Sequence, residues 1–153
     1  MTFKRIFVAA LVILLTGAFS HVYVQAQISA KAQAKELVLK AEEFVIANGP
    51  EAAIVEINKQ DGQFVKDYFH VFAYDLKGKV IADPFRPSLR GKNVLGEKDN
   101  KGKFFRKEII EKAKTKGEGW VDYTYFNPTK KKDKTKTIYF KKVGEMVICC
   151  NAY

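Results

Sequence analysis

Apolar and polar residues follow two different periods along the chain, and the period changes near residue 68. Residues 30–47 carry apolar side chains at three- and four-residue steps, which is the pattern of an amphipathic helix. The sequence Asn-Gly-Pro at 48–50 ends this helix, and its proline suits the start of a second, shorter helix over 51–58. A third helix is predicted over 103–116, where apolar residues again share one face.

The segments after residue 68 have the composition of strands. A hairpin is predicted over 68–82, where two aromatic and β-branched runs flank a Lys-Gly turn. Three more strands are predicted over 120–126, 135–142 and 146–152, with short turns between them. Five strands linked in this way form an antiparallel sheet with helices gathered on one side, so we expect an α+β fold. The intervening segment 83–102 is a long loop, and such loops are usually functional.

The first 26 residues have the pattern of an export signal. Two basic residues at 4–5 precede an apolar run over 6–15, and small residues suit cleavage after Ala26. We therefore expect a signal peptide over 1–26 and a periplasmic or secreted domain over 27–153. The alternative is an uncleaved N-terminal helix that anchors the domain to the membrane, since the apolar segment nearly reaches the length of a membrane span.

The chain is strongly basic, with a formal net charge of +10, and removal of residues 1–26 leaves +8. This excess favours anionic partners such as small acids or envelope polymers. Because an exported domain rarely meets nucleic acid, we expect no nucleic-acid partner. The lysine-rich segment 130–134 falls in a predicted turn, where it forms either a solvated hairpin tip or a patch that docks onto an anionic surface.

Recognisable catalytic and metal-binding patterns are missing from the sequence. His70 is the only histidine after residue 26, and no second histidine or cysteine lies at ligand spacing, so we expect no metal site and no cofactor. The motifs of serine hydrolases, zinc proteases and phosphate-binding loops are also missing, and we expect no enzymatic activity. Cys149 and Cys150 are neighbours on a strand and point to opposite faces, so we favour two separate thiols over a strained vicinal disulfide.

Aromatic residues are dense on the predicted strands. On 120–126, Tyr123 and Tyr125 share one face, and on the next strand Lys136 alternates with its neighbour Thr137. Tyrosines beside a lysine give an apolar wall with hydroxyls and one positive charge, as a pocket for a small anion requires. The same pattern also fits aromatic residues that cover a helix-packed sheet, with the lysine solvated.

Several short motifs follow one another in order along the second half of the chain. Residues 68–93 show an aromatic strand, an Asp-x-x-Gly turn and a closing Gly-Lys-Asn. Residues 99–126 show Asp-x-x-Gly-Lys before a helix and then Gly-Trp-Val-x-Tyr. A Lys-x-x-Tyr follows at 136–139, and the chain closes with Asn-Ala-Tyr. In this order the motifs resemble a single Cache domain of type 2, a PAS-like family, and the resemblance extends from about residue 30 to the last residue.

The resemblance implies a PAS-like five-stranded antiparallel sheet with a long N-terminal helix packed behind it. It also implies a sensor-type domain that binds a small organic acid or similar metabolite between the sheet and the long loop. Carried over position by position, it implies nine ligand-binding residues: Phe72, Tyr74, Asp83, Arg86, Trp120, Tyr123, Tyr125, Lys136 and Tyr139.

One position departs from the family pattern, because Asp83-Pro84 stands where the family usually has His-Pro. An acid in the pocket would repel a carboxylate unless it is protonated or paired with Arg86 or Lys136. A cationic or neutral ligand therefore stays an alternative at this point.

The sequence ends at the last predicted strand, so we expect a stand-alone domain without its own output module. Its expected partner is a small-molecule ligand, with a membrane or envelope partner as a further candidate. The alternative function is an envelope interaction protein that uses its basic hairpin to bind an anionic surface or a partner protein.

Overall fold

The computed structural model describes residues 29–153, and the export signal predicted over 1–26 lies outside them. Lys31–Tyr153 form one compact unit. The N-terminal helix covers residues 29–48 and ends at Gly49, whose φ of 86° few other residues adopt. Helix α2 (Pro50–Ile57) follows directly, with proline in its first turn, where a missing N–H group costs no hydrogen bond. Both helices agree with the sequence prediction to within one residue at each end.

The strands form an antiparallel sheet in the order β1–β2–β6–β5–β4, and β3 pairs with β2 beside this path. The fold is therefore α+β, as predicted. The sequence analysis missed the two-residue β1, and it predicted β4 over 120–126 and β5 over 135–142, so both strands are longer than predicted at each end. The strand bounds are β1 (Val65–Lys66), β2 (Phe69–Asp75), β3 (Val80–Ala82), β4 (Glu118–Asn127), β5 (Lys132–Val143) and β6 (Met146–Ala152).

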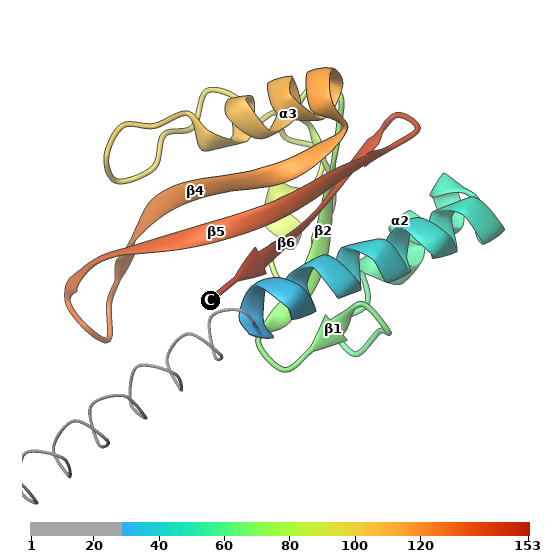
Figure 1. Cartoon of the computed structure of the whole chain (residues 1–153), viewed down its shortest axis with the longest axis horizontal. Coiled ribbons are helices and arrows are strands. Elements are labelled where there is room, and N and C mark those ends of the chain that lie inside the picture. Colours follow the sequence, from blue (N-terminus) through green and yellow to red (C-terminus); the bar gives the residue numbers. More distant parts are fainter. Residues whose placement is uncertain (1–28) are drawn as a thin grey trace, which may run out of the picture. The chain divides into compact units, whose positions relative to one another are not determined.

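Different layers cover the two faces of the sheet (Figure 1). The N-terminal helix packs on one face, where Lys141 of β5 bridges to Glu42 at 3.1 Å. Helix α3 (Phe105–Lys116) packs on the other face and shares a hydrophobic core with β2, β4, β5 and β6. The buried members of this core are Phe72, Tyr74, Val80, Val94, Phe105, Ile109, Ile110, Ala113, Val121, Ile138, Phe140, Val147 and Cys149.

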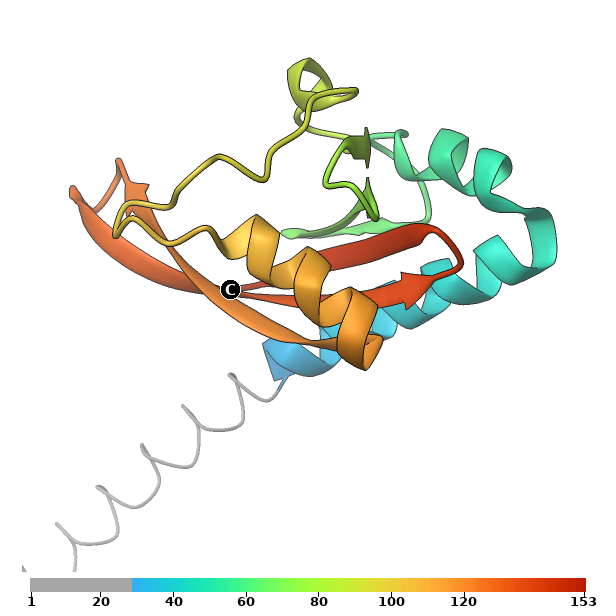
Figure 2. The same cartoon turned by 90° about the horizontal axis from the view of Figure 1, so that it is seen from above.

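The loop between β3 and α3 runs from the short helix η1 (Pro87–Leu89) to the β4–β5 hairpin (Figure 2). There it covers the free edge of β4. Asp99 Oδ2 accepts the Thr124 N–H at 2.8 Å, and the Asn100 N–H donates to the Thr124 carbonyl at 3.1 Å. Asn100 Nδ2 also donates to Asp133 Oδ1 at 2.9 Å, near the lysine-rich turn. These bonds hold the C-terminal part of the loop against the β4–β5 hairpin.

The two cysteines are free and buried, as the strand alternation predicted. Cys149 belongs to the core beneath α3, whereas Cys150 pairs with Val71 in the β2–β6 register. Within residues 29–153, no helix combines the length and the apolar character that a membrane crossing requires.

Candidate ligand-binding site

A cavity of about 20 Å³ lies between the sheet, α3 and the long loop. This volume holds roughly one water molecule. Four of the nine residues predicted from the sequence line this cavity, namely Phe72, Tyr74, Arg86 and Tyr123. The full lining is Phe72, Tyr74, Arg86, Phe105, Arg106, Tyr123, Ile138 and Asn151.

Asp83 is the buried anion beside this cavity, with 1% of its surface exposed. Its Oδ1 accepts the backbone N–H groups of Phe85 at 3.1 Å and Arg86 at 2.9 Å. Its Oδ2 accepts the Arg86 Nε–H at 3.0 Å and completes an ion pair. Because Arg86 neutralises this carboxylate and both its oxygens are occupied, Asp83 does not make the pocket repulsive to an anion. The departure from the family's His-Pro is thus compensated locally.

Lys136 is a half-buried cation on the same face of the sheet as Tyr123, its partner in the β4–β5 register. Its Nζ lies 4.0 Å from the centroid of the Tyr125 ring and 4.3 Å from that of Tyr153. Among the described residues it forms no ion pair. Burial and the nearby charge of Arg86 lower the pKa of the ammonium group. An anion bound beside Lys136 would offset both effects.

Arg106 is a pocket residue that the sequence analysis missed. It is 9% exposed, pairs with Glu97 at 2.8 Å and lies over the ring of Phe105 at 4.5 Å. The signal was present in the sequence, because Arg106 stands three residues before Ile109, on the apolar face of its helix. An arginine on such a face usually serves a specific partner.

Asn151 was also missed, and it contributes an amide to the same wall. The Tyr123 hydroxyl donates to Asn151 Oδ1 at 3.1 Å. Burial raises the pKa of Tyr123 to about 12, so its hydroxyl is protonated at neutral pH and remains a donor.

Trp120 and Tyr139 lie on the opposite face of the sheet, which corrects the sequence-based site. They pair across β4 and β5 with ring centroids 4.9 Å apart. Lys31 and Lys35 of the N-terminal helix lie over the two rings at 5.3 and 5.2 Å. Side chains alternate along a strand, so Trp120 cannot share a face with residue 123, nor Tyr139 with residue 136. These two residues join the helix to the sheet instead.

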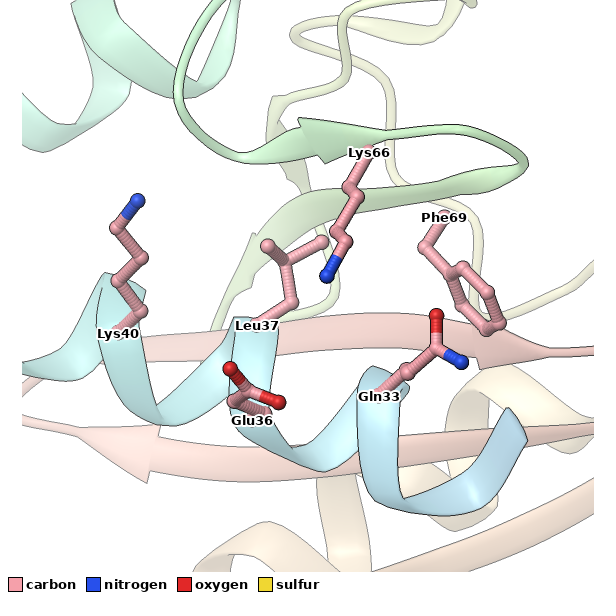
Figure 3. Close-up of a pocket in the computed structure, with 6 residues that line it drawn as sticks. All are labelled: Gln33, Glu36, Leu37, Lys40, Lys66 and Phe69. Carbon is pink, nitrogen blue, oxygen red and sulfur yellow. The ribbon is translucent and has the colours of Figure 1, made fainter. Parts of the chain in front are cut away.

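A second cavity, of about 30 Å³, lies between the N-terminal helix and strands β1 and β2 (Figure 3). It too has room for about one water molecule. Two lysines and one glutamate are among its lining residues, and because both lysines are exposed, solvent screens their attraction for an anion. Its lining is Gln33, Glu36, Leu37, Lys40, Lys66 and Phe69. In the described part of the chain, no three acidic, histidine or cysteine side chains are grouped as a metal site requires.

Comparison with known proteins identifies the architecture around this pocket. A family model described as a Cache domain matches residues 22–149. The chain belongs to the Cache domain family. This agrees with the resemblance to a single Cache domain of type 2, and Cache domains are sensor domains.

Three solved structures share this fold. A methyl-accepting chemotaxis protein from Vibrio parahaemolyticus is 21% identical, with a TM-score of 0.63 over 82% of this chain and 88% of that one. A Cache chemosensory domain solved to explain carboxylic acid recognition is 22% identical, with a TM-score of 0.59 over 91% and 95%. A periplasmic sensor domain of a chemotaxis protein is 19% identical, with a TM-score of 0.57 over 88% and 96%. At these identities the likeness establishes the fold alone, and the predicted PAS-like α+β fold is confirmed.

Proposed function

We propose that this Cache domain binds a small monocarboxylate in the pocket between the sheet, α3 and the long loop. The observation that carries the proposal is Lys136, a half-buried cation without an acidic partner in residues 29–153. Arg86 and Arg106 add two charges, and Asp83 and Glu97 neutralise them. These three cations and two carboxylates together have one excess positive charge, which matches a ligand with a single carboxylate.

The apolar part of the pocket suits a short carbon chain. Phe72, Phe105 and Ile138 line the cavity together with two tyrosines. Such a mixture of apolar enclosure and a few polar groups is typical of small-molecule sites. Because the cavity holds about one water molecule, binding requires the surrounding groups to move outward. The groups best placed to move are Tyr153, which is 53% exposed, and the side chain of Arg86, which is 42% exposed.

We further propose that the domain acts outside the cytoplasm. The signal pattern over 1–26 supports this location. A related fold occurs in a protein described as a periplasmic sensor domain. The ligand-bound domain would pass its signal to a partner in the envelope.

The test is a thermal-shift series on the purified protein with acetate, propionate and butyrate, and with ethylamine and propionamide as cationic and neutral counterparts. A ligand that binds the folded state raises the melting temperature in a concentration-dependent way and adds about 2.7 kcal/mol at a hundred times its Kd. We expect the carboxylates alone to do so. If ethylamine or propionamide raises the melting temperature more than any acid, the monocarboxylate assignment is wrong.

A triple variant, Lys130→Gln with Lys131→Gln and Lys132→Gln, separates this function from envelope binding through the basic hairpin. These lysines lie in or next to the turn between β4 and β5. We expect the triple variant to keep the full carboxylate-induced shift. Loss of the shift in this variant, with Lys136 intact, would favour the hairpin as the binding element.

A further inference from the structure

His70 is a residue next to the pocket with one imidazole nitrogen that the described residues leave unpaired. Its Nε2 atom is buried and forms no hydrogen bond within residues 29–153. Buried polar atoms in proteins nearly always have a partner, so an exception needs a specific explanation. A group that recognises a ligand is one such explanation.

The position of His70 places it at the edge of the proposed site. It lies on the same face of β2 as the pocket residues Phe72 and Tyr74, because side chains alternate along the strand. Val71 pairs with Cys150 of β6, so the same register brings His70 beside Asn151. The imidazole ring lies 6.1 Å from the ring of Phe72.

Phe85 in the loop packs edge-on against the imidazole, with the two ring centroids 5.0 Å apart. Three charged groups, Asp83, Arg86 and Lys136, act on His70. Burial lowers the pKa of the imidazole, Asp83 opposes this effect, and the two cations reinforce it. The ring is therefore neutral at pH 7 and offers one N–H donor and one acceptor nitrogen.

We infer that His70 is a ligand-recognition residue of this pocket, and that it hydrogen-bonds an oxygen on the carbon next to the ligand's carboxylate. The inference rests on the proposed function. If Lys136 and Arg86 hold the carboxylate, the carbon next to it lies close to both cations. His70 lies near the same two cations, so an oxygen on that carbon comes within its reach. The chain would accordingly prefer 2-hydroxy and 2-oxo monocarboxylates to the unsubstituted acids.

The test compares lactate and pyruvate with propionate, which has the same three carbons without the second oxygen function. Isothermal titration gives the Kd of each acid for the wild type, His70→Phe and His70→Gln. Phenylalanine keeps an aromatic ring between Phe72 and Phe85, and glutamine keeps a hydrogen-bonding group. We expect the wild type to bind lactate or pyruvate about tenfold more tightly than propionate, which is the size of one hydrogen bond.

The variants decide whether His70 causes this preference. His70→Phe should bind all three acids with equal affinity and leave the Kd of propionate within threefold of wild type, and His70→Gln should retain part of the preference. A preference that survives in His70→Phe overturns the inference, and so does an equal loss of all three acids in a variant with unchanged circular dichroism. If propionate binds the wild type as tightly as lactate and pyruvate do, the inference is wrong and the proposed function stands. If no acid binds the wild type, the proposed function is wrong as well.

Discussion

Asp83 holds Arg86 beside the pocket, with 3.0 Å between Asp83 Oδ2 and Arg86 Nε. The same carboxylate caps the loop through two backbone N–H groups, and the Asp83 carbonyl accepts two hydrogen bonds from Arg90 at 2.9 and 2.7 Å. One buried residue thus orients the loop and holds a guanidinium group at the cavity. Its replacement should affect both stability and binding.

We expect Asp83→Ala to lower the free energy of unfolding by about 1–3 kcal/mol. The variant leaves two backbone donors without a partner and Arg86 without its counter-charge, and the partial exposure of Arg86 limits the cost. Urea denaturation measures this change. Asp83→Asn keeps an oxygen for the two N–H groups and should lose less; equal losses in the two variants would contradict the capping role.

The turn between β2 and β3 requires glycine at position 78. Gly78 has a φ of 82°, and a Cβ atom there would lie 2.3 Å from Leu95 Cγ. Gly91 has a φ of 83°, with nothing within 4 Å of the same added atom. We expect Gly91→Ala to cost about 1 kcal/mol for backbone strain alone and Gly78→Ala to cost clearly more. Urea midpoints measure both costs, and equal midpoints would show that the Leu95 contact is relieved without cost.

The two buried thiols should be chemically inert in the folded protein. Burial raises the pKa of Cys149 well above its ordinary value and that of Cys150 to about 12, so the thiolate is scarce at pH 8. We expect the native protein to react with Ellman's reagent only as fast as it unfolds and to release two equivalents in urea. Rapid reaction of the native protein, or an intact mass 2 Da below the reduced value, would contradict this account.

The contacts of Glu118 in β4, which accepts hydrogen bonds from β5 and pairs with Lys35 of the N-terminal helix at 3.9 Å, should weaken in acid. The hydrogen bond from the Tyr139 hydroxyl, followed by that from Lys141, lowers the pKa of Glu118. Because the folded-state pKa is the lower one, this stabilisation is complete above the usual glutamate pKa and is lost as the pH falls through the folded value.

Glu118→Gln should therefore remove a small part of the acid dependence, below about 1 kcal/mol, because the side chain is 45% exposed. The measurement is the difference in urea stability between pH 7 and pH 3.5. An unchanged difference in Glu118→Gln would show that this carboxylate does not contribute to acid sensitivity.

The bounds of most helices and strands can be predicted from local sequence patterns. Which side chains meet in the site depends instead on how the strands pair and which of their faces point the same way. Strand β6 has the bounds that its composition predicted, and the helices end at their expected caps. The nine candidates taken from the family resemblance mixed both faces of the sheet, although alternation alone already separates Trp120 from Tyr123. The placement of Lys136 between two tyrosine rings needs the register of β5 with its neighbours, which no local pattern contains.

The central claim is that Lys136 receives the carboxylate of a small acid. Its most direct test is the Kd of propionate for the wild type, Lys136→Met and Lys134→Met. Methionine keeps an unbranched apolar stem, and Lys134 lies on the same strand face one alternation farther from the pocket. We expect Lys136→Met to weaken binding at least 30-fold and Lys134→Met to change it less than threefold. Equal affinities of the two variants, or unchanged binding by Lys136→Met, would contradict the proposed site.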